Sequence, residues 1–106
     1  MISRGDVYLV ALDPTVGAEI QKTRPCLVLS PNELNRALST VIVAPMTTQG
    51  HPYPTRVRVS FERTRGFVVL DQLRTVDGAR LVKRLGRLDA KTLAGVLDLL
   101  GELFAP

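Results

Sequence analysis

Short apolar runs separated by polar turns dominate the chain, and this pattern is typical of strands. Most runs contain β-branched residues and end at Gly, Pro, Asp or Asn, which favour turns. The run after Thr55 alternates, with Val57 and Val59 on one face and Arg56 and Arg58 on the other. The expected strands are Val7 to Leu12, Cys26 to Ser30, Thr40 to Pro45, Thr55 to Phe61, Phe67 to Leu70 and Leu81 to Leu88.

The last element is expected to be a helix. Asp89 is a suitable N-cap, and apolar residues then recur at helical spacing. That stripe comprises Leu93, Val96, Leu97, Leu100, Leu103 and Phe104. Five or six short strands with one closing helix predict a mainly β fold: a small, strongly bent antiparallel barrel, formed by residues 1–106 as a single domain.

Composition and charge limit the expected cellular location and the expected ligands. Hydrophobic residues make up 45% of the 106 residues, but no run approaches the roughly 18 apolar residues of a membrane span. The start of the chain lacks a signal-peptide pattern, so we expect a cytoplasmic protein without membrane contact. The net charge is +4, and eleven of the fourteen cationic residues are arginine, which favours phosphate recognition. The single cysteine, Cys26, lies in an apolar run and is expected to be a buried structural thiol.

Arg24 precedes Pro25 at the start of a continuous apolar run, Cys26 to Leu29. Proline lacks a backbone N–H and favours an extended backbone in the residue before it, so Arg24 is expected at the mouth of a central strand. A guanidinium fixed at such a rim can bind two phosphate oxygens at once. The alternative is an ion pair with a loop carboxylate such as Glu19.

The sequence lacks the residues and motifs that several kinds of catalysis and cofactor binding require. His51 is the only histidine, lies between Gly50 and Pro52, and is expected to be a surface loop residue. No zinc spacing, P-loop or dinucleotide fingerprint is present, so we expect no metal and no cofactor. The remaining candidates are polar residues near the ends of the expected strands: Glu19, Arg24, Thr47, Asp71, Gln72 and Arg74.

Five blocks of sequence together resemble the MazF/PemK family of toxin endoribonucleases. They are Arg4 to Tyr8 (RGDVY), Leu12 to Glu19 (LDPTVGAE), Thr23 to Val28 (TRPCLV), Val41 to Thr47 (VIVAPMT) and Asp71 to Asp77 (DQLRTVD). The resemblance implies an SH3-like barrel of the CcdB/PemK type that forms a homodimer. It also implies cleavage of single-stranded RNA, chiefly messenger RNA, without metal, inhibition of growth, and silencing by a cognate antitoxin. No binding of DNA by the toxin alone is expected.

The resemblance also assigns roles to residues. The family's catalytic arginine and threonine fall on Arg24 and Thr47, which would stabilise charge on phosphorus oxygens as the ribose 2′-OH attacks. Such a reaction leaves a 2′,3′-cyclic phosphate and a 5′-OH. Glu19 and Asp71 are the candidates for proton transfer, with Gln72 as a further acid/base or supporting residue. The expected RNA-binding residues are Lys22, Thr48, Arg56, Arg58 and Arg74.

Departures from the family pattern leave alternatives open. The loop from Ile20 to Thr23 lacks the two glycines common in relatives, which predicts a stiffer loop, and Thr48 is a second candidate for the hydroxyl role. Asp71, Arg74 and Asp77 could instead form a buried ionic brace. The rival functions are a catalytically silent barrel that binds RNA or a protein, and a gyrase poison of the CcdB type. The latter acts through a helix that ends in tryptophan, which this chain lacks.

Overall fold

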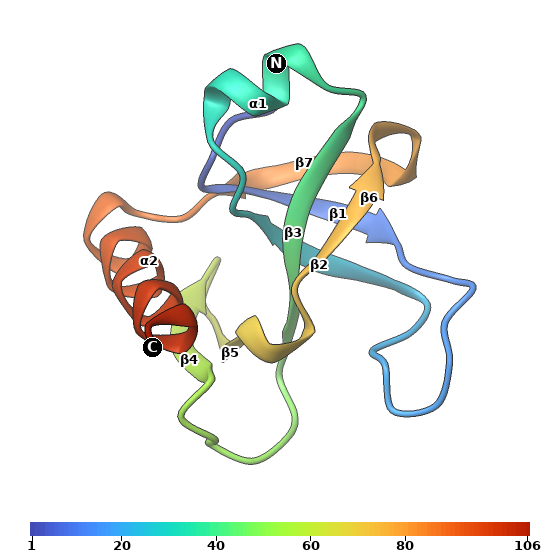
Figure 1. Ribbon diagram of the computed structural model, residues 1–106. Helices are drawn as coiled ribbons and strands as arrows, with labels where there is room; N and C mark the ends of the chain where they lie inside the picture. Colours follow the sequence, from blue (N-terminus) through green and yellow to red (C-terminus); the bar gives the residue numbers. More distant parts are fainter.

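The computed structural model describes all residues, 1–106, and consists of seven strands and a long C-terminal helix (Figure 1). In chain order the strands are β1 (Asp6–Ala11), β2 (Thr23–Val28), β3 (Thr40–Thr47), β4 (Arg56–Phe61), β5 (Thr64–Val69), β6 (Arg74–Asp77) and β7 (Leu81–Arg87). The helices are α1 (Asn32–Ala37) and α2 (Ala90–Phe104), with single 3-10 turns η1 (Leu70–Gln72) and η2 (Gly78–Arg80).

All strand pairs are antiparallel, in the order β4-β5-β3-β2-β1-β7, with β6 also paired to β3. β3 is the central strand and changes partners along its length. Its first half pairs with β6, residues 43–45 pair with β2, and Met46 and Thr47 pair with β5. The sheet therefore curls strongly, as the sequence predicts. Its two edge strands approach each other at Gly86 of β7, where an added Cβ would lie 3.0 Å from the Phe61 ring of β4.

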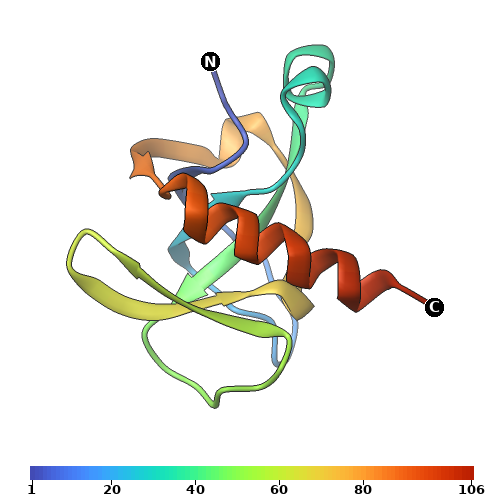
Figure 2. The ribbon, with the colours of Figure 1, turned by 90° about the vertical axis from the view of Figure 1, so that its left-hand side faces the viewer.

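Two apolar clusters lie on the two faces of the curled sheet. β2 contributes to both, because Leu27 belongs to one cluster while Cys26 and Val28 belong to the other. This alternation confirms the prediction of a central strand packed on both faces. The cluster that contains Leu27 also contains Val96 of α2, which lies across the sheet in Figure 2.

Helix α2 begins where the sequence predicts. The Asp89 carboxylate accepts hydrogen bonds from the Thr92 backbone N–H and hydroxyl, at 3.1 and 2.7 Å. The first three turns of the apolar stripe pack on the core. Its end does not, because Phe104 is 70% exposed. No helix of the chain is long and apolar enough to cross a membrane.

β6 is the element that the sequence pattern failed to predict. The expected strands leave out the region after Asp71, but residues 74–77 form a strand with β3 in which Val76 pairs with Val41. Only Val76 of the four points into the core. One inward residue does not make an alternating pattern, so the sequence of this segment does not identify a strand. Its extended structure depends on pairing with β3.

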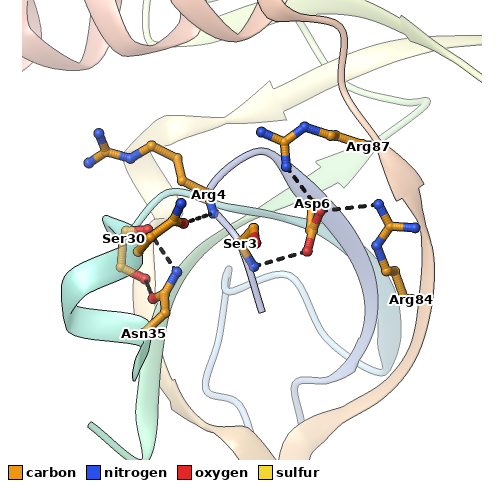
Figure 3. Close-up of polar contacts among 8 residues, drawn as sticks. Ser3, Arg4, Asp6, Ser30, Asn35, Arg84 and Arg87 are labelled. Atoms are coloured by element: carbon orange, nitrogen blue, oxygen red, sulfur yellow. Dashed lines mark hydrogen bonds and ion pairs between the residues drawn. The ribbon is translucent and has the colours of Figure 1, made fainter. Parts of the chain in front are cut away.

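The N-terminal turn is held by the carboxylate of Asp6, a residue that is 2% exposed. Figure 3 shows this carboxylate between Ser3 and the two arginines Arg84 and Arg87. One carboxylate oxygen accepts from the Ser3 N–H, and the other lies 3.3 Å from both Arg84 and Arg87. Both arginine side chains are half exposed, so solvent screens these pairs and their main effect is to join the turn to β7.

Candidate functional site

Strand ends bring Arg24 and Thr47 to one place. The ladder between β2 and β3 stops at the pair Cys26 and Pro45. Two residues further along that register, Arg24 would stand opposite Thr47 on the same face of the sheet. Pro25 lacks the N–H that the next rung of this ladder needs, and β3 turns instead to β5. The two strands therefore diverge where the sequence predicts the site.

The divergence opens a hollow of about 270 Å³, called here the first hollow. Its lining includes Arg24, Thr47, Thr48, Phe61, Glu62 and Phe67. The lining thus combines apolar and aromatic side chains with one guanidinium, one carboxylate and three threonine hydroxyls. This combination can hold a nucleobase beside a phosphate.

Arg24 is exposed and belongs to none of the three ion pairs of the chain. Its Nε donates to the Gln21 carbonyl at 3.2 Å, and no bond occupies its two terminal Nη groups. Glu19 does not pair with it, because the Glu19 carboxylate accepts from the Val16 N–H. The ion-pair alternative for Arg24 is therefore wrong, and both Nη groups can bind an anion.

Thr47 holds a defined orientation. Its Oγ1 accepts a hydrogen bond from the Gln49 N–H at 3.1 Å, so the hydroxyl proton is left to donate elsewhere. β5 lies very close at this point, and a Cβ on Gly66 would come within 2.5 Å of the Thr47 carbonyl oxygen. The turn bond orients the Thr47 hydroxyl, whereas no hydrogen bond of the Thr48 side chain is found.

The remaining polar candidates gather in a second hollow of about 340 Å³, lined by Glu19, Asp71, Gln72 and Arg74 among others. Arg74 donates to the Leu12 carbonyl at 3.1 Å. Asp71 accepts from the Thr55 hydroxyl at 2.9 Å and lies 3.4 Å from Arg56. The alternative of a buried ionic brace is wrong: no ion pair joins Asp71, Arg74 and Asp77, and both carboxylates are exposed. Asp77 accepts from the Ala79 N–H.

The arginines of β4 differ in their surroundings. Arg56 lies 5.0 Å from the centre of the Tyr53 ring as well as beside Asp71, and its side chain is 18% exposed. Arg58 stacks over the Phe67 ring at 5.3 Å and remains exposed. Lys22, at the end of the β1–β2 loop, is exposed and lines neither hollow.

Cys26 has the character expected of a structural thiol. It is fully buried, and burial raises its pKa to about 12, against the smaller opposing effect of Arg74. A thiol with so high a pKa is almost wholly protonated at neutral pH and is a poor nucleophile. No group of three or more His, Cys, Asp or Glu side chains lies close enough together to hold a metal ion.

Sequence reasoning missed several residues of the first hollow. Phe61, Glu62 and Phe67 come from the β4–β5 hairpin, whose role only the fold reveals. Glu62 is the one carboxylate in this lining. The turn residues Glu62 and Arg63 both have positive φ, of 47° and 65°, although neither is glycine, so no turn signal identified them.

The chain is similar to known proteins over almost its whole length. A family described as PemK-like, MazF-like toxin of type II toxin-antitoxin system matches residues 3–104. The chain belongs to the PemK/MazF toxin family. Endoribonuclease PemK of Escherichia coli is 40% identical over 108 residues, which cover 96% of this chain and 81% of that protein.

Solved structures agree with the family assignment. MazF from Deinococcus radiodurans has a TM-score of 0.84 and 30% identity, covering 96% of this chain and 94% of that one. An endoribonuclease in complex with its cognate antitoxin, from Mycobacterial species, has the same TM-score at 26% identity, covering 100% of this chain and 98% of that one. The curled sheet with its C-terminal helix is thus the MazF fold.

Proposed function

We propose that residues 1–106 act as one toxin domain that cleaves single-stranded RNA, chiefly messenger RNA, without a metal ion and so inhibits translation and growth. The observation that carries this proposal is the meeting of Arg24 and Thr47 in the first hollow, at strand ends where β2 and β3 diverge. Membership of a family of toxins, and 40% identity to an endoribonuclease, support it.

In the proposed mechanism the ribose 2′-OH attacks the adjacent phosphorus in line. Negative charge then grows on the phosphorus oxygens, where the Nη groups of Arg24 and the hydroxyl of Thr47 donate hydrogen bonds. Arg24 is proposed to act by charge stabilisation, because a guanidinium offers N–H donors and no acceptor. As the bond from the 2′-oxygen to phosphorus forms, the bond from phosphorus to the 5′-oxygen breaks, and the leaving 5′-oxygen takes a proton from water. The products carry a 2′,3′-cyclic phosphate and a 5′-OH.

The acceptor of the 2′-OH proton is proposed to act from within the first hollow. Glu19 and Asp71 line the second hollow instead, and Asp71 is already bonded to Thr55 and Arg56. We therefore assign these two carboxylates, with Gln72, to supporting roles. Glu62 or a water molecule is left as the acceptor beside Arg24.

The bound strand is proposed to extend from the first hollow to the second. Thr48 belongs to the first and Arg74 to the second, while Lys22, Arg56 and Arg58 would contact phosphates beside them. We further propose a cytoplasmic homodimer that a cognate antitoxin protein silences. The structure of a Mycobacterial endoribonuclease in complex with its cognate antitoxin supports a partner of this kind.

Paired substitutions test the catalytic assignment. Arg24→Ala and Thr47→Val should each lower the rate of RNA cleavage by about 100- to 1,000-fold, the loss typical of a missing charge-stabilising donor. Thr47→Ser keeps the hydroxyl and should retain most of the activity. Unchanged cleavage by Arg24→Ala and Thr47→Val, with circular dichroism showing folded protein, would refute the assignment. A folded wild-type protein that never cuts RNA would favour the silent-barrel or gyrase-poison alternative.

A further inference from the structure

The side chain of Gln72, the last residue of η1, binds the backbone of the β1–β2 loop. Its Oε1 accepts from the Ile20 N–H at 2.7 Å, and its Nε2 lies 3.4 Å from the Ala18 carbonyl oxygen. Both ends of the carboxamide therefore bind loop backbone. Gln72 itself is firmly placed, because it ends η1 next to Leu70, which is fully buried.

The same loop holds Arg24. Gln21, whose carbonyl accepts from the Arg24 Nε, follows directly after Ile20. On its other side, the Lys22 N–H donates to the Asp13 carboxylate at 3.0 Å. The Gln21 carbonyl therefore lies between two anchored residues. Ile20 is held by its backbone hydrogen bond to Gln72 and by packing of its side chain on the apolar cluster that contains Cys26.

We propose that Gln72 is a positioning residue for Arg24, acting through the backbone of residues 20 and 21. The proposal rests on the proposed function, since it concerns how Arg24 meets the phosphate. A long arginine side chain has many rotamers, and a fixed acceptor for Nε restricts them and directs both Nη groups outward. Loss of this anchor should reduce the fraction of Arg24 in the productive orientation without weakening RNA binding.

The experiment uses Gln72→Met, which keeps the length of the side chain and removes both hydrogen bonds. We expect kcat for a short RNA substrate to fall about five- to tenfold with KM unchanged, as fits the loss of one or two neutral hydrogen bonds. In an Arg24→Lys background, which lacks the Nε–H, the same substitution should have no further effect. Glu102→Gln, on the exposed face of α2, is the matched control and should behave as wild type.

A second measurement does not depend on activity. By NMR with ¹⁵N-labelled protein, the Arg24 Nε–H should exchange with solvent several-fold faster in Gln72→Met than in wild type. Unchanged exchange, or an equal loss of kcat in both backgrounds, would overturn the proposal. So would a rise in KM with constant kcat, which would indicate direct contact of Gln72 with RNA. If wild type cuts no RNA but the exchange difference is present, the proposed function fails while the structural link stands.

Discussion

Gly66→Ala tests the close approach of β5 to Thr47. An added Cβ would lie 2.5 Å from the Thr47 carbonyl oxygen and 3.2 Å from its carbonyl carbon. Both are backbone atoms, so no rotamer change relieves the contact. Gly66 does not have a positive φ, and the expected effect therefore comes from lack of space rather than from backbone strain.

The cost can be worked out from this geometry. To restore ordinary contact, β5 and the end of β3 must separate by roughly 1 Å, and overpacking of this kind costs about 1–3 kcal/mol. Lower entropy of the unfolded chain offsets about 0.4–1 kcal/mol. We expect a net loss of about 1–2 kcal/mol in the free energy of unfolding, which would lower Tm by roughly 5–10 °C. Since Thr47 moves, RNA cleavage by the folded variant should also slow.

Urea unfolding followed by circular dichroism measures the loss, and Gly95→Ala is the matched control. Gly95 lies in α2 with nothing within 4 Å of its added Cβ, so the same chemical change should raise stability by up to about 1 kcal/mol through helix propensity. Gly66→Ala with wild-type stability and wild-type cleavage would show that the contact does not constrain Thr47.

Three further predictions concern other parts of the chain. Because burial raises the pKa of Cys26 to about 12, a thiol reagent at pH 8 should modify it only after unfolding; rapid labelling of native protein would contradict this. Hydrogen bonds from Thr92 lower the pKa of Asp89 in the folded state, so its contribution to stability is present above the unfolded pKa and lost as pH falls through the lower, folded pKa. Asp89→Ala should therefore be less stable than wild type at pH 7, with the gap narrowing in acid; an equal gap at pH 7 and pH 2 would refute this reasoning. Replacing Arg56 and Arg58 by Ala should reduce the salt dependence of RNA binding by about one counterion per lost phosphate contact, chiefly through the exposed Arg58, whereas an unchanged slope would exclude both from the interface.

Local pattern was sufficient to predict much of the fold. The Arg24–Pro25 pair marked the start of β2, the alternation after Thr55 identified β4, and Asp89 marked the start of α2. Each signal depends on neighbours a few residues apart. The five blocks of family resemblance supplied the pairing of Arg24 with Thr47, which strand patterns alone do not specify.

Contacts between distant parts of the chain were not predictable in this way. The bond from Gln72 to Ile20 spans 52 residues, and nothing near Gln72 indicates its partner. The closeness of Gly66 to Thr47 likewise depends on β3 leaving β2 for β5. The stiffness of the loop from Ile20 to Thr23 stays a prediction, and the side chains that hold this loop lie outside it: Gln72 accepts from the Ile20 N–H and Asp13 from the Lys22 N–H.

The most direct test of the proposed function is cleavage of a long single-stranded RNA in EDTA, with mapping of the fragment ends, for wild type and Arg24→Ala side by side. The account predicts discrete cuts by wild type that end in 2′,3′-cyclic phosphate and 5′-OH, and none by the variant. Intact RNA with folded wild-type protein, or equal cutting by Arg24→Ala, would contradict it.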